Sequence, residues 1–261
     1  MSLIRARQSI TRVFPHQGNR RFIVPNRLGA ATTTLFEGLV SQSDVDTDGR
    51  SDAAPFDHIL NNVATLQNAP AVITGDGGFS GMDFVTAEEK TATLPPPAID
   101  YTASLTYAFR AKTSTGIADN SCVGLGNNTD AQPLLAGKIT RDAGGNAEAF
   151  LRSNGGQATF VSGTLGGNND GDEHVITIRS LGGGTSRVQL VVDLLLSGDD
   201  SQTFGGATTI DNMVWGGFLL AGVYAAWGTN EMFWLAVWDR LLSNDEIVAL
   251  NAKPNPFGRS P

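Results

Sequence analysis

The chain of 261 residues has little cysteine and no long hydrophobic run. Its single cysteine, Cys122, cannot form an internal disulfide, which excludes a small secreted domain held together by disulfides. The longest apolar stretch is Trp215–Trp227, which contains three glycines and is shorter than the roughly 20 residues that a membrane helix needs. The first residues also lack the continuous apolar region of a signal peptide. We therefore expect a soluble protein made without a secretion signal.

Acidic residues are missing from the first 36 positions, where six arginines occur instead: Arg5, Arg7, Arg12, Arg20, Arg21 and Arg27. The rest of the chain then holds 12 basic and 26 acidic residues, a net charge of −14. A basic segment ahead of an acidic body indicates that residues 1–35 are a docking arm for an acidic groove on a neighbouring subunit. A solvated, disordered tail is the alternative. The arm is short and has no nucleic-acid-binding motif, so nucleic acid is not an expected partner.

Glycine is abundant, with 31 residues spread between short apolar runs, which is typical of a turn-rich all-β fold. Residues 104–111 alternate between apolar and polar side chains, as in a half-buried strand. Residues 147–162 form two such runs around Asn154-Gly155-Gly156, and residues 174–196 repeat the pattern around three glycines. In that second hairpin the apolar face is expected to continue from Val188 to Leu196. Consecutive antiparallel hairpins predict a sandwich of two sheets.

The C-terminal segment changes period from strand to helix. Both faces of residues 233–238 are apolar, with Phe233, Leu235 and Val237 on one side, which predicts a central strand. Ser243 and Glu246 have the spacing of a capping box, so a short helix should follow and pack against the sandwich. The apolar residues of 57–68 fit one face of a second amphipathic helix, and an irregular segment is the alternative.

This ending resembles the C-terminal signature of LamG-like jelly-roll domains, in the superfamily of concanavalin A-like lectins and glucanases. The residues that carry the resemblance are Val237, Trp238, Asp239, Arg240, Leu242, Ser243, Glu246, Ile247 and Leu250. Asp193 matches an aspartate of the preceding hairpin, without the usual neighbouring tyrosine and glycine. The resemblance implies an all-β antiparallel jelly roll, concanavalin A-like, over residues 69–261, with a short C-terminal helix. Residues 36–68 are expected to form a linker with a first strand and an acidic loop, after the extended N-terminal arm.

The combination of a basic arm with one such domain resembles virion proteins of tailed bacteriophages, such as head decorations, head fibres or tail proteins. It implies a non-enzymatic structural protein located on the virion, held by its arm to capsid or tail subunits and in contact with host glycans. A homo-oligomer is expected, with a trimer as one candidate, and a membrane is not an expected partner. The alternative is a free, calcium-dependent carbohydrate-binding module.

Two groups of residues are candidates for a binding site, and none is a candidate for catalysis. Glucanases of the superfamily need paired carboxylates on one strand, and no such motif occurs here, so no catalytic residue is predicted.

The sequence from Asp44 to Asp52 contains a possible calcium-binding pattern, with the ligands Asp44, Asp46, Asp48 and Asp52. Pro55 stands where a closing glutamate belongs, Asp57 is a substitute, and a solvated acidic turn is equally compatible. Trp215 and Trp227 are predicted to stack on sugars, whereas Trp234 and Trp238 are predicted to pack in the core.

Overall fold

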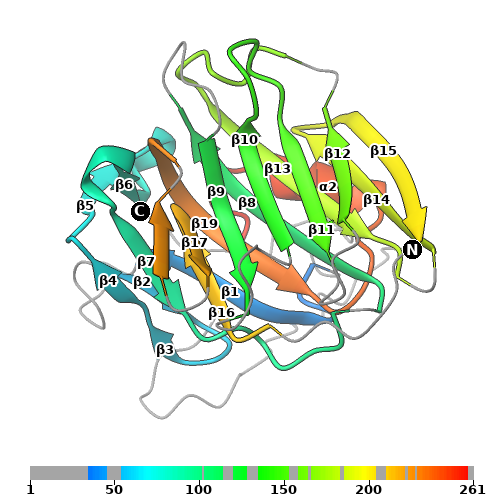
Figure 1. The fold of residues 1–261 in the computed structure, drawn as a ribbon, viewed down its shortest axis with the longest axis horizontal. Coiled ribbons are helices and arrows are strands. Elements are labelled where there is room, and N and C mark those ends of the chain that lie inside the picture. Colours follow the sequence, from blue (N-terminus) through cyan, green and yellow to red (C-terminus); the bar gives the residue numbers. More distant parts are fainter. Residues whose placement is uncertain are drawn as a thin grey trace, which may run out of the picture.

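The computed structural model describes residues 35–45, 54–101, 103–113, 120–127, 135–152, 158–163, 166–182, 185–203, 210–220, 223–226 and 228–257. These residues form two antiparallel sheets packed face to face, with an α-helix on the outside (Figure 1). No helix within these ranges is long and apolar enough to cross a bilayer. The predicted all-β sandwich with a short C-terminal helix is confirmed.

The larger sheet has ten strands among the described residues. In order across the sheet they are β15 (Leu195–Thr203), β14 (Thr185–Val192), β13 (Glu173–Ser180), β8 (Leu105–Lys112), β19 (Asn230–Trp238), β1 (Leu39–Val45), β2 (Pro55–Asp57) and β3 (Asn62–Val63), with β6 (Ser80–Phe84) beside β19 and β5 (Ala71–Thr74) beside β6. Two short 3-10 helices, Asp76–Gly78 and Thr86–Glu88, follow β5 and β6. Both hairpins predicted from the sequence are present, one in each sheet.

The smaller sheet has seven strands in the described part of the chain. In order they are β12 (Ala158–Ser162), β11 (Glu148–Arg152), β10 (Leu135–Thr140), β9 (Asn120–Gly126), β16 (Asn212–Trp215), β7 (Thr91–Leu94) and β4 (Thr65–Gln67). A separate hairpin, β17 (Gly217–Leu220) with β18 (Val223–Ala226), lies over β9 and β16 (Figure 1). The ring of Phe218 rests against Gly124, where any larger side chain would collide with it.

The core lies between the two sheets and follows the alternation seen in the sequence. Leu105, Tyr107 and Phe109 of β8 point into it and are at most 1% exposed. Leu125 of β9, in the opposite sheet, belongs to the same core cluster. Burying such side chains stabilises the fold by about 1.5–3 kcal/mol each before the entropy cost of ordering them. This continuous cluster holds the sandwich together.

Strand β19 is central, as predicted, and is buried on both faces. Met232, Leu235 and Val237 belong to the core between the sheets. The prediction for Phe233 was wrong, because the pairing of β19 with β8 shifts register between Met232 and Trp234. This bulge places Phe233 beside Trp234 on the outer face of the large sheet.

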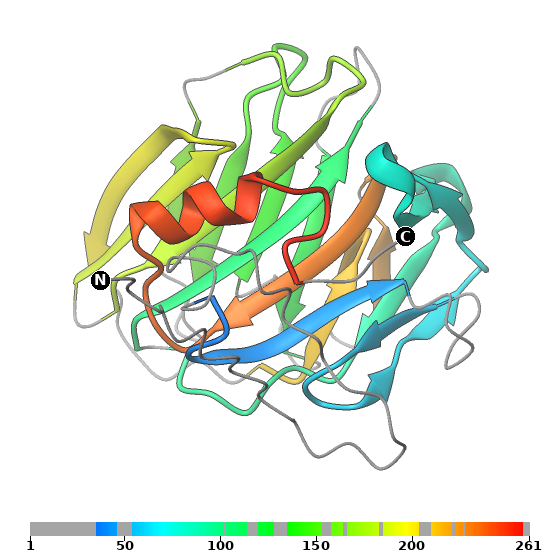
Figure 2. The same ribbon diagram turned by 180° about the vertical axis from the view of Figure 1, so that it is seen from behind.

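A second apolar cluster on that outer face explains why the chain ends in a helix. Helix α2 (Asn244–Asn251) lies across the large sheet, as Figure 2 shows. Its Ile247 and Leu250 pack with Trp234 and Trp238, so the predicted core position of these two tryptophans is correct. The capping box is present, since the Ser243 side chain accepts from the backbone N–H of Glu246 and the Glu246 carboxylate accepts from that of Ser243.

Two other predictions were wrong. Residues 57–68 do not form a helix, because Asn61 adopts φ 57° and the chain turns through β2, β3 and β4. The apolar face of β14 ends at Val192, where Asp193 and Leu194 make a two-residue turn into β15. Leu194 and Leu196 are therefore 56% and 55% exposed instead of buried.

Residues 36–68 contribute strands to both sheets. β1 pairs with the central strand β19 and with β2, and β4 pairs with β7 of the smaller sheet. Leu35, the last residue of the predicted arm, is fully buried, and its carbonyl accepts a hydrogen bond of 2.7 Å from the Trp238 indole N–H. The sandwich thus begins well before residue 69. The remainder of the arm lies outside the described residues.

Candidate functional site

The first of the predicted calcium ligands, Asp44, lies inside the fold and is 3% exposed. Its Oδ1 lies 2.7 Å from His58 Nε2, and its Oδ2 accepts hydrogen bonds of 3.0 Å from Gln42 Nε2 and 3.2 Å from Asn255 Nδ2. These contacts join β1, the segment after β2 and the C-terminal segment. The Asp44 carboxylate therefore holds the fold together, and calcium binding by this residue stays a prediction.

Asp57, the suggested substitute ligand, is also buried. It accepts hydrogen bonds from Ser41 Oγ and from the backbone N–H groups of Ile59 and Leu60. Burial raises the pKa of this carboxyl, against the opposing effect of those hydrogen bonds. Within the described ranges, no group of three or more histidine, cysteine, aspartate or glutamate side chains could hold a metal ion.

Asp46, Asp48 and Asp52 lie outside the described residues, so a calcium site formed by them stays a prediction. The same is true of Trp227 and of the arm residues Arg5, Arg7, Arg12, Arg20 and Arg21. The structure does place Trp215, in β16. Trp215 is fully buried in the core between the sheets, so its ring cannot stack on a sugar and that prediction was wrong.

The buried glutamates are paired with cations. Glu173 meets Arg110, Glu246 meets Arg240 at 2.6 Å, and Glu148 lies 3.4 Å from the Lys138 ammonium. These three positions are arranged as structural ion pairs.

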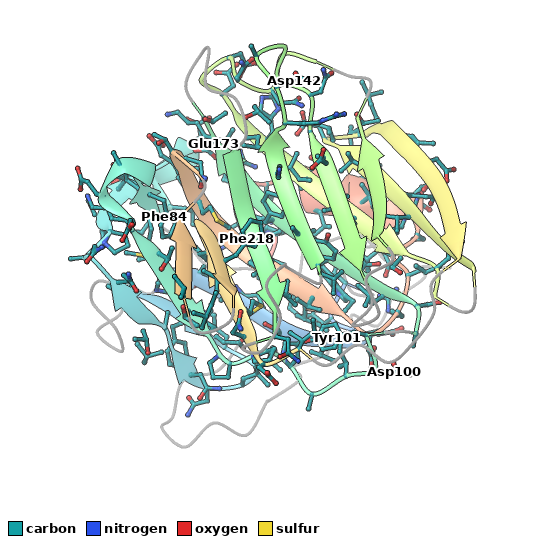
Figure 3. The ribbon with its side chains drawn as sticks, in the orientation of Figure 1. Phe84, Asp100, Tyr101, Asp142, Glu173 and Phe218 are labelled. Carbon is teal, nitrogen blue, oxygen red and sulfur yellow. The ribbon has the colours of Figure 1, made fainter. Side chains whose placement is uncertain are left out.

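Two polar loops meet at one end of the sandwich, close to Asp142 at the top of Figure 3. The first, residues 142–146, connects β10 to β11, and the second, residues 166–172, precedes β13. They are joined by backbone hydrogen bonds from Gly167 to Gly144 (2.8 Å) and from Asn168 to Gly145 (3.1 Å). The side-chain amide of Asn168 adds a bond of 2.7 Å to the Gly145 carbonyl. We call these interlocked loops the polar platform.

The platform presents carboxylates in a fixed geometry. Asp142 accepts hydrogen bonds from the side chain and backbone of Asn146 and from the Gly144 N–H, and these lower its pKa. Asp170 accepts from the backbone N–H of Asp172, whose own side chain is exposed. Gly171 adopts φ +91°, a conformation that favours glycine, and no atom lies within 4 Å of the position of a Cβ there. Rigid carboxylates and carbonyls of this kind can accept hydrogen bonds from adjacent hydroxyl groups of a ligand.

His174 anchors the platform to the sheet. Its Nε2 lies 3.1 Å from Asp170 Oδ1 and its Nδ1 lies 3.0 Å from Asp193 Oδ2. Both carboxylates can only accept, so the doubly protonated imidazolium is the form that donates to both. The hydrogen bond to Asp193 is the main reason that the pKa of His174 is raised, with Asp170 acting in the same direction against burial.

No site was predicted from the sequence at Asp170, Asp172 or Glu173. The signal that could have found the platform is the high content of aspartate, asparagine and glycine at 142–146 and 166–172, which is typical of tight turns. Nothing in the sequence shows that these two loops lie side by side, because the pairing of β10, β11 and β13 decides that.

No protein-family model matches the sequence, and no curated protein matches it closely enough to be a relative. Solved structures do match. The binding domain of Paraclostridial Mosquitocidal Protein 1 has a TM-score of 0.59 at 15% identity, over 82% of this chain and 52% of that one. A botulinum neurotoxin serotype D ligand binding domain, in complex with N-acetylneuraminic acid, gives 0.57 at 12% identity over 85% and 52%.

The binding domain of botulinum neurotoxin DC, in complex with SialylT, gives a TM-score of 0.58 at 8% identity, over 82% of this chain and 51% of that one. At such identities the likeness concerns the fold alone. The chain spans about half the length of these matched structures, so their ligands are properties of those proteins. What this chain shares with these binding domains is a β-sandwich fold.

Proposed function

We propose that the chain is a non-enzymatic, lectin-like domain that binds neutral glycans at the polar platform. The observation that carries this proposal is the interlocking of residues 142–146 with 166–172, which fixes several hydrogen-bond acceptors on an exposed surface. The similarity of fold to receptor-binding domains, one of them in complex with N-acetylneuraminic acid, supports the same class of function.

The charge of the platform selects the kind of glycan. Asp142, Asp170 and Asp172 are all carboxylates at or near its surface, and the chain as a whole carries a net charge of −8. An anionic sugar such as sialic acid would be repelled, whereas the hydroxyl groups of a neutral hexose can donate to these carboxylates. Every tryptophan that the structure describes is buried, so hydrogen bonds rather than stacking would supply the affinity. We expect a weak interaction, with a Kd of about 0.1–1 mM.

We further propose that the domain is exposed on a bacteriophage virion, as a LamG-like structural or decoration protein anchored by residues 1–34. Support comes from the six arginines before Glu37 and the acidic composition of the rest of the chain. The arm would bind an acidic surface of capsid or tail subunits, and several copies would present the weak glycan sites together. Immunogold electron microscopy on purified particles tests this location. Regular label on heads or tails supports it, and protein found only free in the lysate refutes it.

The glycan proposal is tested by NMR titration of the full-length protein with neutral and sialylated oligosaccharides. Neutral sugars should shift resonances of residues 142–146 and 166–172, and Asp172→Ala should weaken binding at least fivefold. Glu88→Ala is the matched control, because Glu88 is an exposed acid on a different element. Binding that prefers sialylated sugars, or that EDTA abolishes, would refute neutral, metal-independent recognition. The second result would favour the calcium-dependent module.

A further inference from the structure

A groove separates helix α2 from the outer face of strands β13, β14 and β15, which lie beside it in Figure 2. Its volume is about 320 Å³, at the lower end of the range of ligand pockets. Five aliphatic side chains line it: Val191, Leu194, Leu196, Ile247 and Val248. Leu194, Leu196 and Val248 are each more than half exposed. Grouped exposed apolar side chains of this kind mark a binding surface more often than isolated ones do.

The walls of the groove are tied together. The Asn251 side chain of α2 donates a hydrogen bond of 2.8 Å to the carbonyl of Asp193, at the turn that carries Leu194. The Asp193 carboxylate in turn accepts a bond of 2.9 Å from the N–H of Val175 in β13. These bonds fix the spacing between helix, turn and sheet, so the groove is already open and ligand binding would not require a rearrangement.

One cation, Arg179, lines the groove on its polar side. Its Nη1 donates bonds of 3.1 Å to two neutral acceptors, the Leu242 carbonyl and Asn244 Oδ1. Its Nε is buried without a hydrogen-bond partner in the described structure. Burial lowers the pKa of Arg179, with Asp199 acting in the opposite direction. A desolvated guanidinium whose two described hydrogen-bond acceptors are neutral favours a ligand that brings a carboxylate.

We propose that this groove binds a short segment of a partner protein in which aliphatic side chains flank an aspartate or glutamate. The aliphatic groups would cover Leu194, Leu196 and Val248, and the carboxylate would approach the side chain of Arg179. A sugar fits less well, because five aliphatic residues and no aromatic one line the groove. The site is separate from the polar platform and does not depend on glycan binding.

Charge complementarity also decides between the alternative occupants. The arm of this chain carries six arginines and no acidic residue before Glu37, so it cannot offer Arg179 a carboxylate. A two-fold dimer through this groove would bring together two copies of the same lining, which contains no carboxylate for Arg179. Strand β15 also carries the exposed Asp199 at the edge of the large sheet, and a charge there opposes edge-to-edge pairing of copies.

The test is a methyl NMR titration of the full-length protein with an unlabelled, N-acetylated and C-amidated peptide, Leu-Leu-Asp-Leu. We expect saturable shifts of the Leu194, Leu196 and Val248 methyl groups. The same peptide with asparagine in place of aspartate should bind at least fivefold more weakly, which tests the carboxylate without altering the protein. Leu196→Ser should weaken binding at least fivefold, while Val72→Ser, at a 40% exposed position on β5, should leave it unchanged.

Four results would overturn the proposal. The first is the absence of saturable shifts, and the second is equal affinity for the aspartate and asparagine peptides. The third is octanoate binding as tightly as the peptide, which would make this a site for a free aliphatic acid. The fourth is a concentration-dependent dimer in sedimentation that Leu196→Ser dissociates, which would assign the groove to a second copy.

Discussion

Replacing Asp44 with asparagine distinguishes a structural carboxylate from a calcium ligand. In the fold, Asp44 Oδ2 accepts from the side-chain amides of Gln42 and Asn255, and Oδ1 lies against His58 Nε2. An amide group at the Oδ2 position would turn an acceptor into a donor. Asn255 cannot rotate to compensate, because its Oδ1 accepts a 3.0 Å bond from the Phe257 N–H. The Asn255 amide would then be a buried donor without an acceptor, and the bond to His58 would be weaker. Together these changes should lower the free energy of unfolding by about 2–3 kcal/mol.

That cost should lower Tm by about 4–12 °C in differential scanning calorimetry of the full-length protein. Asp172→Asn is the control, since the Asp172 side chain is exposed and its loss should leave Tm nearly unchanged. The scans are made in EDTA and again in millimolar calcium. The Asp44→Asn loss should be the same in both. A loss seen only with calcium, or no loss in either, would refute the structural role.

Three more substitutions test other parts of the fold. His174→Asn should flatten the pH dependence of the free energy of unfolding. The pKa of His174 is raised in the folded state, so its contribution to stability is fully present below the ordinary pKa of about 6.5. That contribution is lost as the pH rises through the pKa of the folded state. An unchanged profile in urea titrations would contradict this. Ser243→Ala should cost about 1 kcal/mol in urea denaturation by removing the helix cap. Gly137→Ala should cost about 1–3 kcal/mol because its methyl group would collide with the Phe109 ring.

The sequence predicts the elements whose physics is local. The alternation of β8, the two glycine-centred hairpins and the capping box of α2 all follow from patterns within about 25 residues, and all are present. The errors occur where a single residue changes the register. The bulge after Met232 redirects Phe233, and the left-handed Asp193 ends a strand that apolar alternation would have continued.

The candidate sites could not be predicted in the same way, because exposure depends on pairing between distant strands. The sequence places Trp215 next to Gly216 and Gly217, which favours a loop. The pairing of β16 with both β7 and β9 puts the residue in the interior instead. Asp44 looked like a metal ligand from its spacing to other acids, and it became structural because Asn255, more than 200 residues away, donates to it.

The distribution of side chains argues for two separate kinds of recognition. Trp215, Trp234 and Trp238 are all committed to the two apolar clusters, so the described surface offers no indole on which a sugar could stack. Glycan recognition would then rest on the fixed carboxylates and carbonyls of the polar platform, which discriminate between hydroxyl configurations but bind weakly. The groove beside α2 has the opposite character, with aliphatic walls and one desolvated cation at Arg179. Since neither surface suits the other's ligand, substitutions at Asp172 and at Leu196 should act independently, each weakening one interaction and leaving the other intact.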